Sequence, residues 1–549
     1  MRISTQRSAP SARSSLKERS LNKTSIAGNV FKNITTEKKF FIGVDFGTTF
    51  TSVSYFFHPI NERHPRAFPE QLLSIKNWPD DLSSGDAGGT RPQVPSETWY
   101  SPISLSRDAP QDIDEQDGTL EEFVYDDKDH PLTYIGDANV ESGGDESSEF
   151  LWGYQVHHQQ YRENISRNAG TRVKRSKLHL VPTAYTHDDR VELLRSIESL
   201  IDNGIIRKHG LKDEPDARDV LDIFTDFLVK VLNHTKEQLI QLHNFSSQSV
   251  VEFTLTVPTI WSPNASRILQ TALQNAARLV KFGDISTKKV VVPYIVSEPE
   301  AAAIYMLAGN SSVHPRETFI IADCGGGTVD IVTYEIGTEH PLRLSEEKVT
   351  PGGRSKSFTP LREISNKPGV GYDIELMTGK DASGYPVTAV SCGAVLAALN
   401  KNNGPARRAQ SSYGFFSREP YEKNPPLGYP GHAESTFIRD REICPIDGDE
   451  YVHVINYFVI KGELVPPKYK FQPIISIYTF PLNEEKFICE ELLYVSDKAI
   501  LSHFPLEHDR NKDAQIAGRI IFDMTFLRTR KFIKPTTIRR GPISIVKPH

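Results

Sequence analysis

The chain has 549 residues, of which 38% are hydrophobic and 24% are charged, and its formal net charge is -6. This length and composition predict two or more globular domains with a substantial core. Because the charges nearly balance and no apolar run approaches the ~20 residues of a membrane-spanning helix, we expect neither a nucleic-acid nor a membrane partner.

The N-terminal segment, residues 1–38, is rich in Ser, Arg and Lys and holds only two acidic residues, Glu18 and Glu37. It has too few apolar side chains to fold alone, which predicts a disordered basic segment. A mitochondrial presequence has the same composition and is the alternative.

The first apolar segment, 40–57, is split by Gly47-Thr48-Thr49, which predicts a strand, a tight turn and a second strand. The Pro-, Gly- and Asp-rich stretch 59–150 predicts exposed loops, and 151–156 predicts a short strand. Over 219–242 the apolar residues recur at helical spacing, which indicates an amphipathic helix on a core.

An alternating pattern follows. The segment 251–261 predicts a strand that ends at Pro258, followed by a helix from about Ser266 with Ser262 and Asn264 as N-cap candidates. Three further elements continue it: a strand over 288–296, a helix over 298–307 and a strand over 317–324. Alternation of this kind predicts an α/β domain, with a mixed sheet flanked by helices.

Beyond about residue 415 the sequence pattern changes to short apolar runs, without segments that clearly predict helices. The runs are 452–460, 471–480, 491–496 and 518–527. They predict a small β-rich module. The four cysteines form no CxxC pair, which predicts reduced, buried thiols in an intracellular protein. They are Cys324, Cys392, Cys444 and Cys489.

Two segments repeat each other at a constant offset of 278 residues. Aligning VDFGTTFTSVSYF with ADCGGGTVDIVTY puts Asp45 on Asp323 and Gly47 on Gly325. Each copy brings an Asp to the end of an apolar strand, followed by a Gly/Thr turn and a second strand. Two unrelated hairpins are the alternative interpretation.

The repeat suits a polyphosphate. A turn without bulky Cβ groups lets backbone N–H groups approach phosphate oxygens, and the hydroxyls of Thr48, Thr49 and Thr328 add donors. A carboxylate repels phosphate, so Asp45 and Asp323 imply a hydrated cation between them and the ligand, namely Mg²⁺. Two such hairpins facing one another would clamp a polyphosphate from both sides.

Five segments resemble motifs of the heat-shock-seventy-like ATPases, members of the actin-like ATPase superfamily. They are FIGVDFGTTFTSVSY, TVPTIWSPNASRILQTALQNA, VSEPEAAAIY, IIADCGGGTVDIVTYE and TAVSCGAVLAAL. Trp152-Gly153-Tyr154, and Ala406-Arg407-Arg408 followed by Ser412-Tyr413-Gly414, are similar to the divergent cytosolic branch, the heat-shock-protein-twelve-like group. The resemblance spans about 40–415.

The resemblance implies an α/β actin-like ATPase fold of two duplicated lobes with a C-terminal β-rich extension. The implied domains are the disordered N-terminus at 1–38, lobe I at 39–314, a truncated lobe II at 315–415 and the β-rich extension at 416–549. It also implies a cytoplasmic protein that uses ATP and Mg²⁺, with client proteins or co-chaperones as partners.

The resemblance also implies roles for individual residues. Asp45 and Asp323 would orient Mg²⁺ through its waters, while Glu298 would hold the metal waters or the attacking water, which Asp330 would help to polarise. The phosphates would be cradled by Gly47, Thr48, Thr49, Gly325, Gly326, Gly327 and Thr328. Glu298 also suits the N-terminus of a helix, where the dipole favours a carboxylate, and both roles are compatible.

The family also places a lysine near the γ-phosphate. Lys177 is the best match, with Lys174 three residues away. A solvated surface lysine is the alternative interpretation for each of them.

The adenosine half of the family's site is not recognisable. Only about 40 residues separate Leu344 from TAVSCGAVL, where the family places a subdomain that stacks on adenine and a Gly-Gly turn for the ribose. Pro351-Gly352-Gly353-Arg354 has the wrong flanks, because SEEKVT does not predict a buried strand, and 367–381 looks like a remnant. Either the protein is degenerate here or an exon is misassigned. Without these contacts nucleotide would bind weakly.

Three functions remain open. The first is an ATP-binding, slowly hydrolysing chaperone-like protein. The second is a nucleotide-incompetent interaction or scaffold protein that keeps the fold. The third is a small-molecule kinase of the same fold, which is disfavoured because we find no motif with that group's catalytic Asp base.

Overall fold

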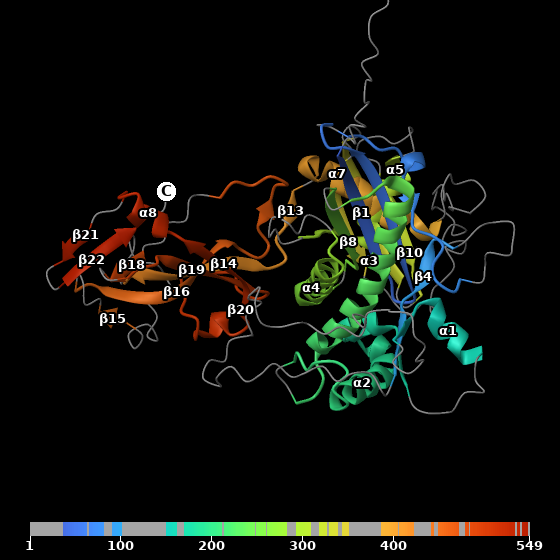
Figure 1. Cartoon of the computed structure of the whole chain (residues 1–549), viewed down its shortest axis with the longest axis horizontal. Coiled ribbons are helices and arrows are strands. Elements are labelled where there is room, and N and C mark those ends of the chain that lie inside the picture. The colour runs from blue at the N-terminus through green and yellow to red at the C-terminus, as the bar shows by residue number, and fades with distance from the viewer. Residues whose placement is uncertain are drawn as a thin grey trace, which may run out of the picture. The chain divides into compact units, whose positions relative to one another are not determined.

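The protein is a mixed α/β protein with several sheets and helices (Figure 1). The computed structural model describes residues 37–546 except for 63–64, 82–90, 102–149, 162–169, 211–212, 247–248, 260, 283–291, 309–317, 327–328, 339–342, 351–385, 405, 422–440, 444–447, 472–477, 482–483, 533–534 and 539–540. Within these ranges, no helix combines the length and apolarity that a bilayer crossing needs. The predicted disorder of 1–38 falls almost wholly outside them.

The largest sheet has the order β3-β2-β1-β8-β9, with β4 also paired to β2. Its strands are β1 (Lys38–Phe46), β2 (Phe50–Pro59), β3 (Leu73–Ser74), β4 (Gln93–Pro95), β8 (Val250–Val257) and β9 (Tyr294–Ser297). β1 and β2 form the predicted antiparallel hairpin, whereas β8 and β9 run parallel to β1. The predicted strand over 251–261 is thus present as β8, and the strand predicted over 288–296 is present as β9, although residues 288–291 lie outside the described ranges.

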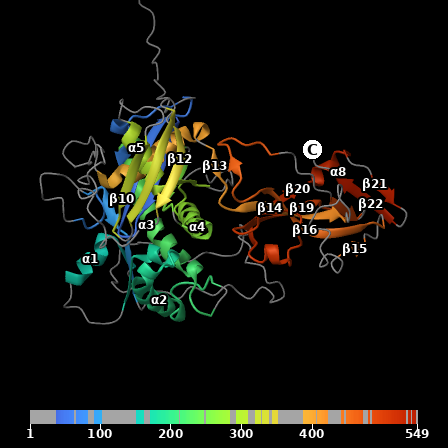
Figure 2. The ribbon, with the colours of Figure 1, turned by 180° about the vertical axis from the view of Figure 1, so that it is seen from behind.

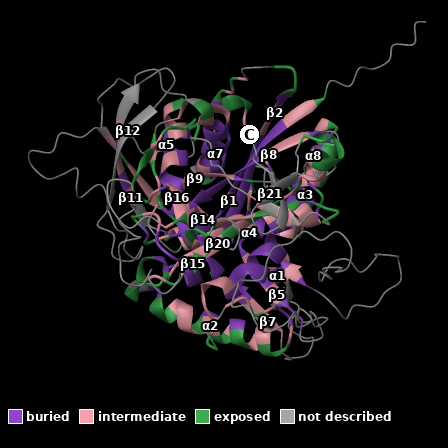
Figure 3. Cartoon of the chain, turned by 90° about the vertical axis from the view of Figure 1, so that its left-hand side faces the viewer, coloured by how far each residue is buried: buried purple, intermediate pink, exposed green. Residues whose placement is uncertain are grey.

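Helices cover both faces of this sheet, and its central strand β1 is coloured largely as buried in Figure 3. On one face, Phe40 and Ile42 share a hydrophobic core with α3 (Leu221–His243) and α4 (Pro263–Leu279). On the other face, Phe41 packs with α7 (Ala389–Asn400). A β1 strand buried on both faces explains its nearly continuous run of apolar residues.

Two glycines allow α7 to pack closely. A Cβ on Gly43 of β1 would lie 2.3 Å from the carbonyl oxygen of Ser391, and one on Gly393 of α7 would lie 1.8 Å from that of Ala301 in α5 (Glu298–Ala308). Side chains at either position would push the elements apart. The predicted helix over 298–307 therefore forms as α5 and packs against α7.

The start of α4 follows its sequence. Ser262 is the N-cap, and its hydroxyl accepts a hydrogen bond of 3.2 Å from the N–H of Ala265. Pro263 occupies the first turn, where its missing N–H costs nothing. Of the two N-cap candidates, Ser262 is correct, and the helix begins three residues before the predicted Ser266.

A second, three-stranded antiparallel sheet has the order β10-β11-β12 (Figure 2). Its strands are β10 (Thr318–Cys324), β11 (Val329–Thr338) and β12 (Arg343–Thr350). SEEKVT lies in β12, although its sequence did not predict a buried strand, because backbone pairing with β11 requires no apolar run. The candidate turn at 351–354 and the remnant at 367–381 lie outside the described residues.

Part of the stretch predicted as loops is ordered into strands. β5 (Glu97–Tyr100) pairs with β6 (Leu151–Trp152) and with β7 (Thr171–Lys174). The strand predicted over 151–156 was wrong after Trp152, because Gly153 turns the chain with φ +57° and α1 (Tyr154–Tyr161) begins. The helix α2 (His187–Asp202) was not predicted.

The C-terminal residues form the predicted β-rich module. One sheet has the order β15-β16-β14-β19-β20 and another β18-β22-β21, while β13 pairs with β17. The elements are β13 (Arg407–Arg408), β14 (Ser412–Pro420), β15 (Glu442–Ile443), β16 (Glu450–Val459), β17 (Leu464–Val465), β18 (Tyr478–Pro481), β19 (Ile488–Ser496), β20 (Gln515–Asp523), α8 (Thr525–Thr529), β21 (Pro535–Ile538) and β22 (Gly541–Val546). The limit predicted between 415 and 416 falls inside β14.

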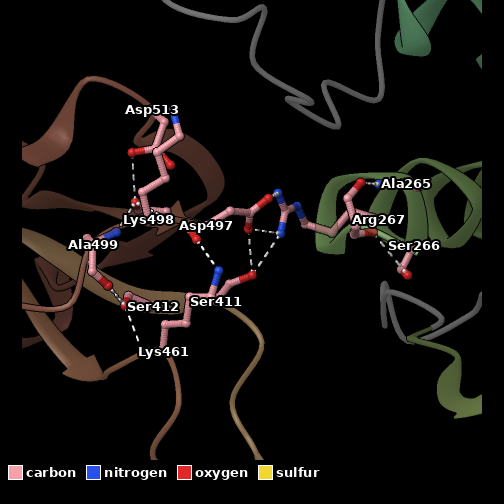
Figure 4. Close-up of polar contacts among 12 residues, drawn as sticks. Ala265, Ser266, Arg267, Ser411, Ser412, Lys461, Asp497, Lys498, Ala499 and Asp513 are labelled. Carbon is pink, nitrogen blue, oxygen red and sulfur yellow. Dashed lines mark hydrogen bonds and ion pairs between the residues drawn. The ribbon is translucent and has the colours of Figure 1, made fainter. Parts of the chain in front are cut away.

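A polar contact joins α4 to the loop after β19 (Figure 4). The guanidinium of Arg267 donates to both carboxylate oxygens of Asp497, each at 3.0 Å, and the hydroxyl of Ser411 donates to Oδ1 at 2.6 Å. Burial alone would raise the pKa of Asp497, but the hydrogen bonds from Arg267 and Ser411 outweigh it and hold that pKa below its ordinary value. The carboxylate therefore stays charged in this contact.

Two of the four cysteines can be compared with their prediction. Cys392 in α7 and Cys489 in β19 are buried and free of disulfides. This agrees with the expectation of reduced, buried thiols for these two residues.

Candidate functional site

The two Gly/Thr turns lie against each other. A Cβ built on Gly326, in the turn after β10, would lie 2.2 Å from Oγ1 of Thr49, in the turn after β1. Only a glycine at 326 leaves room for the Thr49 side chain at this distance. The two turns that the sequence repeat singled out are therefore neighbours in space.

The two hairpins also share a register. Asp45 is the partner of Ser52 in the β1–β2 hairpin, and Asp323 is the partner of Asp330 in the β10–β11 hairpin. These pairs are related by the same offset of 278 residues as the sequences. The repeat thus corresponds to two equivalent hairpins.

Asp45 lies beside the end of the neighbouring parallel strand. The hydroxyl of Thr256 in β8 donates a hydrogen bond of 2.9 Å to Oδ1 of Asp45. Burial raises the pKa of Asp45 from 3.8 to about 7, and the negative charge of Glu298 acts in the same direction. The positive charge of Lys177 and the Thr256 bond oppose this rise without cancelling it. A cation at this carboxyl group would favour its charged form.

Lys177 and Glu298 form a buried ion pair. Nζ of Lys177 lies 2.5 Å from Oε1 of Glu298, and the two side chains are only 5% and 10% exposed. The ammonium group also lies 5.2 Å from the ring centroid of Trp261, within range of a cation–π interaction. Glu298 begins α5, as its sequence context predicted.

The structure distinguishes the two candidate lysines. Lys177 belongs to a short 3-10 helix, Ser176–Leu180, that follows the left-handed residue Arg175 with φ 55°. Lys174 is the last residue of β7; its side chain is 49% exposed and lies 3.5 Å from Glu192. Lys177 therefore contacts the predicted site, and Lys174 lies on the surface.

The other predicted site residues are described to different extents. Gly47, Thr48 and Asp323 are half-buried, and Gly325 and Gly326 are exposed. Asp330 is described by its backbone pairing alone, and Gly327 and Thr328 lie outside the described residues.

The carboxylates suit a metal ion that arrives with phosphate. The described part of the chain holds no cluster of three His, Cys, Asp or Glu side chains able to bind a metal by itself. Mg²⁺ is usually held by one or two carboxylates together with phosphate oxygens and water, which Asp45 and Glu298 could provide. Near the end of β8, Oγ1 of Thr259 is buried and has no hydrogen-bond partner among the described residues, so it could serve a ligand.

Two contributors to this cluster, Thr256 and Trp261, were given no role from the sequence, and neither was Thr259 between them. All three lie in the TVPTIW segment at or just beyond the carboxyl end of β8. A usable signal was present, since β1 and β8 both read as buried strands, and parallel neighbours bring their carboxyl ends to the same edge of a sheet.

Comparisons with known proteins do not identify the chain. No protein-family model matches it, and a search of curated proteins finds no match either.

Proposed function

We propose that this chain is a nucleotide-binding protein with an actin-like ATPase fold, related to the heat-shock-seventy-like ATPases. It would bind Mg²⁺–ATP mainly through the triphosphate, hydrolyse it slowly, and act in the cytoplasm on client proteins. The observation that carries this proposal is the convergence of Lys177, Glu298 and Asp45 beside two facing Gly/Thr turns.

The topology supports the fold part of the proposal. Three antiparallel strands, β3-β2-β1, are followed by the two parallel strands β8 and β9, and a second hairpin repeats the register of the first. A duplicated strand–turn–strand unit with an Asp at the end of each first strand suits a ligand gripped from two sides.

Asp45, Lys177 and Glu298 would have separate roles in binding and hydrolysing the nucleotide. Asp45 would orient the waters of a bound Mg²⁺, whose charge neutralises the phosphates. Lys177 would turn from Glu298 to a terminal phosphate oxygen, which leaves the Glu298 carboxylate as the acceptor for a proton from water. Phosphoryl transfer needs mainly positioning and charge compensation, and these groups can supply both.

Calorimetric titration of the full chain with Mg²⁺–ATP tests the proposal. We expect binding that is lost in Asp323→Asn and strongly weakened in Lys177→Ala. Lys174→Ala is the matched control, because this exposed lysine lies on the same stretch of chain and should leave binding unchanged. The absence of both heat and a thermal shift at millimolar nucleotide would refute it.

One observation favours the second candidate, an interaction protein that does not use nucleotide. The ammonium of Lys177 is already neutralised by Glu298 in a buried pair, so the site is electrostatically satisfied without a phosphate. The same titration decides, because an interaction protein would show no nucleotide binding in any variant.

A further inference from the structure

Strand β20 ends the five-stranded sheet of the C-terminal module. It spans nine residues, Gln515–Asp523, and β19 is its one neighbour among the strands that the structure describes. The opposite end of the sheet is closed by the two-residue strand β15. A long edge strand presents a row of backbone N–H and C=O groups that can pair with another strand.

The centre of β20 is apolar on both faces. Ile520 and Ile521 point to opposite sides of the sheet and are 47% and 52% exposed. Ile488, on the adjoining end of β19, is 46% exposed. Soluble proteins usually protect such an edge with Lys, Pro or a bulge. The β19–β20 register is irregular at Ala517, whereas the segment Arg519–Asp523 beyond it pairs regularly and has no Lys or Pro. An apolar, accessible edge of this length indicates an interaction surface.

We propose that β20 pairs with β20 of a second copy of this chain, antiparallel about a two-fold axis at Ile521. In this register Arg519 of each copy lies opposite Asp523 of the other, and Ile520 lies opposite Phe522. The two ionic pairs would flank an apolar Ile521–Ile521 contact, and opposite charges directly across two strands stabilise their pairing. The two five-stranded sheets would join into one continuous sheet.

Charge complementarity favours this register of the two β20 strands, and it favours a second copy of the chain as the binding partner. Moving the axis by one residue to Ile520 would place Asp523 opposite Ala517 and Arg519 opposite Ile521, which removes both ionic pairs. Arg519 already lies 2.6 Å from Glu490 on β19, so Asp523 of the second copy would extend an existing ionic contact into a network. An unrelated peptide has no reason to carry the matching charges.

Sedimentation velocity of the full chain over a micromolar concentration series tests the pairing. We expect a reversible dimer in the unaltered protein. Ile521→Lys places two like charges on the axis and should weaken dimerisation by roughly tenfold or more. Ile500→Lys is the control, because Ile500 is 61% exposed but lies in the loop after β19. Unfolding midpoints of both variants should stay close to that of the unaltered chain.

Cross-linking tests the register. Ile521→Cys should give a covalent dimer with a short bis-maleimide reagent, whereas Ile500→Cys and the unaltered chain, which has four native cysteines, should not. A chain that stays monomeric throughout the series overturns the proposal. A dimer that survives Ile521→Lys also overturns it, as does a monomer that binds an added extended peptide through β20.

Discussion

Lys177 and Glu298, which are 121 residues apart in the sequence, meet as a buried ion pair with 2.5 Å between Nζ and Oε1. Removing one partner of such a pair leaves an uncompensated charge in a largely buried site. The pair therefore links the stability of the fold to the groups proposed to act on phosphate.

Lys177→Ala should lower the free energy of unfolding by about 3 kcal/mol. Lys174→Ala should change it by less than about 0.5 kcal/mol, because that side chain is exposed. Urea denaturation followed by circular dichroism measures both values. A double variant, Lys177→Met with Glu298→Gln, should recover much of the loss, since no buried charge is left unpaired. If Lys177→Ala and Lys174→Ala lowered the free energy of unfolding equally, the buried ion pair would be contradicted.

Asp45→Asn should stabilise the ligand-free protein at alkaline pH. The pKa of Asp45 rises from 3.8 to about 7 on folding, so its contribution to stability is present below pH 3.8 and is lost as the pH rises through about 7. At pH 8 the variant should be more stable than the unaltered chain by on the order of 1–3 kcal/mol, and at pH 4 the difference should nearly vanish. Unfolding curves recorded across this pH range measure the difference in stability between the variant and the unaltered chain. A difference that does not change with pH would contradict a raised pKa of Asp45.

Gly326→Ala should abolish phosphate binding. The added Cβ would overlap Thr49, so one of the two turns must move. Overpacking of this kind typically costs about 1–3 kcal/mol. Gly518→Ala is the control, because a Cβ there meets nothing within 4 Å. Titration with Mg²⁺–ATP and thermal unfolding compare the two variants. Unchanged nucleotide binding in Gly326→Ala would show that the two Gly/Thr turns are not part of the binding site.

Ligand selectivity should follow phosphate number and not the base. The groups in the proposed site are those expected to contact phosphate and metal, while no adenosine motif like that of the heat-shock-seventy-like ATPases is recognisable in the sequence. We therefore expect Mg²⁺-tripolyphosphate and Mg²⁺–GTP to displace Mg²⁺–ATP with comparable affinity, and adenosine to have no effect. Competition measured with a fluorescent ATP analogue would show this. Strong preference for ATP would indicate adenosine contacts elsewhere in the chain.

The sequence predicted the elements that are determined by local signals such as apolar runs, turn residues and helix caps. The β1–β2 hairpin follows from apolar runs around Gly47-Thr48-Thr49, and α4 follows from its Ser262 cap. The helix α2 was missed because most of its residues are charged or polar, and only three of its side chains are buried. Its buried residues Leu193, Ile197 and Leu200 do recur at helical spacing, and this is the local signal that could have predicted it.

The site was predictable in part for a similar reason. The paired turns follow from an internal repeat, which is a property of the sequence alone. The choice of Lys177 over Lys174 depends on the left-handed turn at Arg175, which redirects the chain into a short 3-10 helix. A non-glycine residue in that conformation is unusual and is fixed by its surroundings. Geometry of this kind becomes visible only when the whole domain is assembled.

The helix α5 has residues in two separate cores. Ala301 packs with Val296 and Ala394 beside the large sheet, whereas Ala303 packs with Val332 and Tyr334 of β11. The same helix begins with Glu298, so α5 carries this carboxylate at one end and packs against both sheets along its length. A cavity far from the Gly/Thr turns, for instance one made by Val332→Ala, would thus tilt α5 and change the geometry of the Lys177–Glu298 ion pair.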